Sequence, residues 1–163
     1  MALVSIQGLT WCQHAGWMLV LYDGASQRRL QITLGLPDAL AVGQELAGQA
    51  TERTGLYQLI GELLRAQPHP ATVTLGLAGA SRARTALVIR TDDGPRTFAT
   101  STADGVALAL RAGLPIVAEG DLLDAFGVPC GAADGEEVEP AAERCEIPPA
   151  FRRALEDVGR DCD

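Results

Sequence analysis

The amino-acid sequence predicts an α+β fold: one compact domain of mixed or antiparallel strands with two pairs of helices, followed by an acidic C-terminal tail. Strand and helix patterns occur in blocks instead of alternating strictly: strands, two helices, strands, then two helices. The 163 residues are 47% hydrophobic and 21% charged, which is typical of a single globular domain. Only 4% are aromatic, so we expect a core of Leu, Val, Ile and Ala.

The first block contains three predicted strands: residues 3–9, 17–22 and 28–34. In the third strand Leu30, Ile32 and Leu34 alternate with polar residues, which is the pattern of a strand with one face in water. The pair Asp23-Gly24 is a hairpin signal. The second and third strands should therefore pair through a tight turn.

Two helices follow, over about residues 37–49 and 54–66. In the first, Pro37 suits the first helical position, and Asp38 lies near the positive end of the helix dipole. The spacing of Ala39, Val42 and Leu46 predicts the face that this helix buries.

The helix at 54–66 carries a wide apolar arc: Leu56, Tyr57, Leu59, Ile60, Leu63 and Leu64. Packing one helix face on one sheet cannot bury the whole arc, and soluble monomers rarely expose a contiguous apolar patch. We therefore predict a homodimer in which two such arcs bury each other across a two-fold axis.

The second block contains strands at 71–77, 83–91 and 95–100, a helix at 103–112, a short strand at 115–118 and a helix at about 120–126. Thr102 is the expected N-cap of the helix at 103–112, and Asp104 lies in its first turn. Gly113 and Pro115 mark the end of this helix.

Residues 1–128 are thus predicted to form the folded domain, and 129–163 an acidic linker with a short C-terminal helix. No apolar run reaches membrane-spanning length, and no basic segment precedes the first apolar stretch. We therefore expect a cytoplasmic protein without a membrane partner. Its four cysteines are widely spaced, so reduced thiols are expected, with a Cys130–Cys145 disulfide as the alternative.

The charge balance argues against tight binding of nucleic acid. The 13 basic residues are all Arg, and 21 acidic residues bring the net charge to -8 and the pI to about 4.7. Nucleic-acid affinity depends largely on phosphate neutralisation by a basic face, which this composition does not indicate. Any nucleic-acid binding should therefore be weak.

Two segments carry a recognisable pattern. Residues 100–116 read TSTADGVALALRAGLPI, and residues 30–39 read LQITLGLPDA. They resemble the patterns A-R-P-S-D-A-I/V-A-L-A-L-R-x-G-x-P-I and L-P-I-W-I-G-x-x-E-A of the bifunctional nuclease (BFN) domain family, whose element order matches residues 3–128. The resemblance implies a homodimeric α+β protein that hydrolyses phosphodiester bonds in DNA and RNA.

The resemblance also implies a divalent cation, Mg²⁺ or Mn²⁺, held by carboxylates. The matching polar positions are Asp38 and Asp104, as catalytic and metal-binding carboxylates, and Arg111, as a donor to phosphate. Each also has a purely structural interpretation, because acids in a first helical turn and an arginine in a last turn favour the helix dipole.

The chain departs from the family pattern at several polar positions. Ser101 stands at the position of the family's arginine. Arg53-Thr54-Gly55, or Thr54-Gly55-Leu56 in a shifted register, stands in place of its T-H-D. Two alternatives to a nuclease therefore stay open. One is a catalytically degenerate homodimeric scaffold or regulatory module, and the other is an anion-binding domain that uses the N-termini of the helices beginning at 37 and 103.

Overall fold

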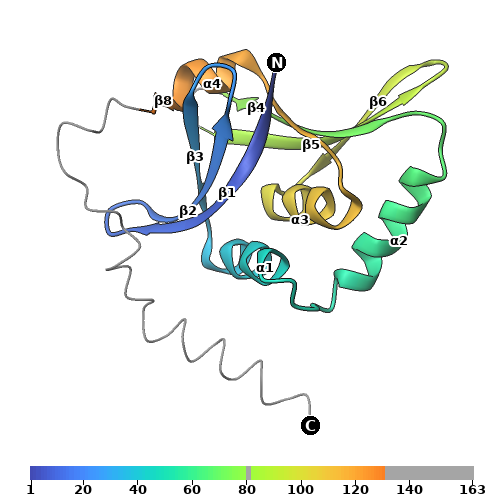
Figure 1. The fold of residues 1–163 in the computed structure, drawn as a ribbon, viewed down its shortest axis with the longest axis horizontal. Coiled ribbons are helices and arrows are strands. Elements are labelled where there is room, and N and C mark those ends of the chain that lie inside the picture. Colours follow the sequence, from blue (N-terminus) through green and yellow to red (C-terminus); the bar gives the residue numbers. More distant parts are fainter. Residues whose placement is uncertain (80–81, 131–163) are drawn as a thin grey trace, which may run out of the picture. The chain divides into compact units, whose positions relative to one another are not determined.

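The computed structural model describes residues 1–79 and 82–130 and confirms the α+β class. Within these residues, eight strands form one mixed sheet with the order β6-β5-β4-β7-β1-β2-β3-β8, accompanied by four helices (Figure 1). The predicted linker and C-terminal helix fall almost entirely on residues 131–163, outside the described residues. None of the described helices is long and apolar enough to cross a membrane.

The strands are β1 (Ala2–Cys12), β2 (Gly16–Asp23), β3 (Arg28–Leu34), β4 (Ala71–Ala78), β5 (Arg82–Thr91), β6 (Gly94–Thr100), β7 (Ile116–Ala118) and β8 (Gly127–Pro129). The helices are α1 (Leu36–Leu46), α2 (Thr54–Arg65), α3 (Thr102–Ala112) and α4 (Gly120–Phe126). All the elements predicted for this part of the chain are present. The short edge strand β8 was not predicted.

The three-residue strand β7 joins the two halves of the sheet. It pairs in parallel with β4 and antiparallel with β1, whereas the other pairings of described strands are all antiparallel. The chain therefore forms one half of the sheet with β1–β3. It then passes through α1 and α2 to form β4–β6, and returns through α3 to β7, which lies between the two halves. Figure 1 shows α1, α2 and α3 gathered together and α4 lying apart from them, beside β3 and β8.

The β2–β3 hairpin forms as predicted, but with a longer loop than a two-residue Asp-Gly turn. Asp23 pairs with Arg28, which leaves Gly24–Gln27 in the loop. The Asp23 side chain organises this loop, because its carboxylate accepts hydrogen bonds from the Ala25 N–H (3.0 Å) and the Ser26 hydroxyl (2.5 Å). The hydrogen bond from Ser26 is the main reason that the pKa of Asp23 lies below its usual value.

Helix α1 departs from the prediction at its C-terminal end. It stops at Leu46 instead of residue 49, just before Gly48, which adopts a left-handed φ of 72°. Ala39 and Val42 are fully buried as expected, but Leu46 is 39% exposed. The position that completes the buried face is Glu45 instead, because its carboxylate has a partner on α3.

Helix α3 is the most buried helix, and its start differs by one residue from the prediction. Its N-cap is Ser101, whose hydroxyl accepts a hydrogen bond from the Asp104 N–H (3.0 Å), while the predicted cap Thr102 is the first helical residue. Gly113 ends the helix in a left-handed conformation, as predicted.

Close packing fixes α3 on the sheet. A Cβ at Gly105 would lie 2.6 Å from Cγ2 of Thr85 on β5, so only glycine allows this approach. The N-terminus of α3 is therefore held firmly against β5 and β6.

The buried apolar residues are Leu, Val, Ile and Ala with Tyr57 as the single aromatic among the described residues, in line with the composition.

Candidate functional site

A polar cavity of about 600 Å³ lies between the two halves of the sheet. We call it the polar cavity; its polar lining residues are Gln31, Thr33, Asp38, Arg82, Arg84, Thr85, Thr100, Ser101 and Thr102. They come from β3, β5 and β6, from the first turn of α1 and from the N-terminus of α3. Strands β3 and β5 are separated in the sheet by β4, β7, β1 and β2, so a strong bend must bring them to one hollow. Figure 1 shows the strands of the two halves running in different directions.

Asp38 is an exposed residue of the cavity wall. Helix α1 presents it in its first turn, directly after Pro37, and the N-cap Gly35 offers no side chain to the helix end. The Asp38 side chain forms no hydrogen bond or ion pair within residues 1–79 and 82–130. Its carboxylate is thus open to a ligand in the cavity.

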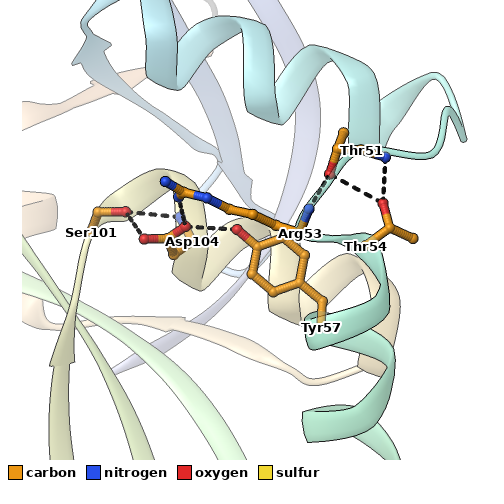
Figure 2. A network of polar contacts seen from close by, with 6 residues as sticks. All are labelled: Thr51, Arg53, Thr54, Tyr57, Ser101 and Asp104. Carbon is orange, nitrogen blue, oxygen red and sulfur yellow. Dashed lines mark hydrogen bonds and ion pairs between the residues drawn. The ribbon is translucent and has the colours of Figure 1, made fainter.

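Asp104 lies at the centre of a hydrogen-bonded network between α2 and α3 (Figure 2). Its Oδ1 accepts from Arg53 Nη1 and from the Tyr57 hydroxyl, both at 2.6 Å, and its Oδ2 accepts from the Ser101 hydroxyl at 2.8 Å. Arg53 is the N-cap residue of α2 and Tyr57 lies in its first turn. The carboxylate therefore ties the N-terminus of α2 to that of α3.

The network lowers the pKa of Asp104. Partial burial raises this pKa, but the hydrogen bonds from Tyr57, Ser101 and Arg53 together outweigh it and hold the pKa below its usual value. Burial, followed by the hydrogen bond to Asp104, raises the pKa of Tyr57. Asp104 is accordingly ionised and Tyr57 protonated at neutral pH.

Ser101 connects the network to the polar cavity. It lines the same cavity as Asp38, and its hydroxyl donates to Asp104. Ser101 thus links the cavity that Asp38 lines to the network around Asp104.

Comparison with known proteins identifies the fold around this cavity. The sequence model of the Bifunctional nuclease domain matches residues 19–130, which is more than half of the chain. The chain belongs to the bifunctional nuclease domain family. The matched range includes Asp38, Ser101 and Asp104. No curated protein matches the chain significantly.

Arg111 has a different environment in this bifunctional nuclease domain. Its Nε donates to the Glu45 carboxylate, and its Nη2 donates to the Gln49 carbonyl at 2.9 Å. The Glu45 side chain is only 1% exposed, and it also accepts from the Thr54 hydroxyl at 3.3 Å. Arg111 does not line the polar cavity, and its guanidinium joins α1 to α3.

The arginines of the cavity were not predicted from the sequence. Arg82 and Arg84 belong to β5 and both line the wall. Their spacing of two residues places both side chains on one face of the strand, and this R-x-R pattern was a usable signal. Arg53, whose guanidinium donates to Asp104, lies in the segment that replaces the family's T-H-D.

The carboxylates of this domain fit a divalent cation only in a restricted way. Among the described residues, no three His, Cys, Asp or Glu side chains gather into a cluster that could hold a metal ion. Mg²⁺ often uses one or two carboxylates and completes its shell with water and substrate phosphate oxygens. Asp38 can serve as such a single ligand, whereas the Asp104 carboxylate already accepts three side-chain hydrogen bonds.

The lowered pKa of Asp104 predicts an acid-dependent stability term. Because this pKa is lower in the folded than in the unfolded chain, the stabilisation is complete above the unfolded value of about 3.9 and is lost as the pH falls through the folded value. We expect the destabilisation caused by Asp104→Asn to be constant from about pH 5 to 8 and to shrink below about pH 4. Urea unfolding of both proteins across this range measures it. Asp23 titrates in both proteins, so its contribution cancels in the difference between their free energies of unfolding. A destabilisation that does not change with pH would contradict the prediction.

Proposed function

We propose that this protein hydrolyses phosphodiester bonds of DNA or RNA in the polar cavity, with Asp38 as the carboxylate that faces the reacting phosphate. One observation carries the proposal. In a bifunctional nuclease domain, a single cavity brings together an acid without a described protein partner, two arginines and several hydroxyl groups.

The cavity has the donors that a phosphodiester needs. Guanidinium groups match the geometry of phosphate oxygens, and donors already in place stabilise the negative charge that develops on them in the transition state. The first turns of α1 and α3 both border the cavity, and the positive ends of their dipoles add to the same potential. These features offset, locally, the net charge of -8.

Asp38 would hold the Mg²⁺ or Mn²⁺ ion that such hydrolysis is expected to need. A bound ion of this kind makes a coordinated water more acidic and offsets negative charge on the phosphate. Asp104 then acts as a positioning residue. Its hydrogen bonds hold Ser101 at the cavity wall and fix the N-terminus of α2 beside that of α3.

A nuclease assay tests the proposal. Labelled single-stranded DNA and RNA are incubated with the full chain and Mg²⁺, Mn²⁺ or a chelator. We expect slow cleavage with at least one of the two ions and none with the chelator. No cleavage of either substrate with either ion, at micromolar protein, overturns the proposal.

A catalytically degenerate homodimeric scaffold is the second candidate. It is favoured by the environments of Asp104 and Arg111, since the two side chains form hydrogen bonds that join helices. A chain that dimerises but fails the nuclease assay would match this alternative.

The exposed face of α2 supports the homodimer. Leu56, Leu59 and Leu63 are each 56–57% exposed and follow one another at helical spacing, whereas Tyr57 and Leu64 are buried. We expect the chain to form a dimer of about twice 17.1 kDa through this leucine stripe, and Leu59→Glu to shift it to monomer, because a charge would then be buried between two copies. Light scattering at tens of micromolar measures both.

Gln58→Glu is the matched control, since it adds the same charge at an exposed position of the same helix outside the stripe. It should leave the mass unchanged. A parent protein that is monomeric at this concentration rules out the dimer.

A further inference from the structure

We propose that Arg82 and Arg84 form the phosphate-binding subsite of the polar cavity, and that Glu119 holds Arg84 until a substrate phosphate displaces it. The inference rests on the proposed function, for which it names the groups that bind the substrate.

Arg82 is the available cation of the subsite. It is an exposed residue at the start of β5, and in the described part of the chain its side chain forms no hydrogen bond or ion pair. Arginine in this state presents its full set of N–H donors to an oxyanion. Nothing among the described side chains has to be displaced before a phosphate reaches it.

Arg84 is held by a competing anion. Its Nη2 donates to both carboxylate oxygens of Glu119, at 3.2 and 3.0 Å. The Glu119 side chain is 21% exposed, and the Arg84 side chain is 60% exposed. An ion pair as accessible as this contributes little to stability, so a phosphate with several oxygen acceptors can replace the carboxylate.

The backbone makes room for this ion pair. Gly76 on β4 lies opposite Arg84 in the β4–β5 register. A Cβ at Gly76 would overlap the Glu119 carboxylate and would lie 2.9 Å from Arg84 Nε. Glycine at this position thus lets Glu119 lie across β4 and reach the arginine of the neighbouring strand.

The surroundings select phosphate over a simple anion. The Thr100 hydroxyl lines the same cavity and can donate to a further oxygen of the ligand, whereas the Ser101 hydroxyl donates to Asp104 and the Thr102 hydroxyl is hydrogen-bonded to Thr85. Asp38 lines the same cavity, and its negative charge weakens the binding of an anion that arrives without a cation, so a phosphate accompanied by a divalent ion is favoured.

Binding of a short oligothymidylate and of inorganic phosphate tests the subsite. Both are measured with a chelator present, so that no cleavage occurs, and the oligonucleotide is measured at several salt concentrations. Arg82→Ala should weaken oligonucleotide binding about tenfold and reduce the salt slope by about 0.7 to 1. Arg82→Gln, which keeps the polar side chain, should behave in the same way.

Glu119→Gln tests the competition. It should strengthen binding of both ligands about threefold or more, because Arg84 is released. The double variant Glu119→Gln/Arg84→Ala should lose this gain. Glu62→Gln and Arg65→Ala, which alter an exposed ion pair on α2 with a distance of 3.0 Å, are the matched controls and should change neither affinity nor slope.

The outcomes separate this inference from the proposed function. Wild-type affinity and slope in Arg82→Ala, or no gain in Glu119→Gln, overturn the inference even where the chain cleaves DNA. A gain that persists in the double variant also overturns it. Loss of binding in Arg82→Ala, in a protein that cleaves nothing with Mg²⁺ or Mn²⁺, supports the subsite and rejects the nuclease.

Discussion

Replacement of Asp38 by Asn is expected to reduce the rate of phosphodiester cleavage about 100-fold or more. The change removes the negative charge while keeping the size of the side chain, so a divalent ion loses its protein ligand in the cavity and general-base assistance is lost with it. Asp38 has no hydrogen-bonding partner among the described side chains, so the variant should still fold, losing at most the about 0.3–1 kcal/mol that an acid in a first helical turn contributes. Initial rates on single-stranded DNA with Mn²⁺ measure the effect.

Asp38→Glu is the informative companion variant. It keeps the carboxylate and introduces the glutamate that the family pattern carries at this position. It should keep activity within about tenfold of the parent. Asp93→Asn, in the exposed turn between β5 and β6, removes the same charge away from the cavity and should have no effect. Equal rates for the parent and Asp38→Asn would exclude Asp38 from the reaction.

Replacement of Arg111 by Met should lower the free energy of unfolding by about 3 kcal/mol, the lower end of the range for breaking a buried ion pair. The variant leaves the Glu45 carboxylate almost completely buried, with only the Thr54 hydroxyl as its side-chain partner. The Arg111 side chain is 22% exposed, and access of water limits the loss. Urea unfolding at neutral pH measures it.

The double variant Glu45→Leu/Arg111→Met gives the control. Apolar side chains of similar size remove the unpaired charge, and most of the lost stability should return. A single variant as stable as the parent would show that the pair contributes nothing to the α1–α3 interface. A nuclease defect in Arg111→Met without loss of stability would instead return Arg111 to the list of phosphate ligands.

Local pattern was sufficient for most of the secondary structure. The strand at 28–34 alternates cleanly, and its predicted ends agree with those of β3. Helix punctuation was equally direct at Gly113, where a left-handed residue ends α3. The cap at the other end was misplaced by one residue because Ser101 and Thr102 are both good caps, and only the backbone conformation distinguishes them.

Burial of charge could not be predicted from periodicity. Helical spacing placed Leu46 on the buried face of α1, but Glu45 occupies that position. A carboxylate can be buried only when a partner compensates it, and its partner Arg111 lies 66 residues further along the chain. No local signal connects two residues so far apart.

The sequence alone determined the α+β class, the order of the elements, the family and the positions of Asp38 and Asp104 in the first turns of two helices. Those properties depend on neighbours within a few residues, where periodicity and capping operate. The tertiary structure decided which side chains share a cavity. Asp38, Arg82 and Ser101 line one cavity because a bent sheet brings β3 toward β5 and because close packing at Gly105 holds the start of α3 against β5 and β6. The packing of α1 on α3 likewise pairs Arg111 with Glu45, because a carboxylate that is almost completely buried needs a compensating cation.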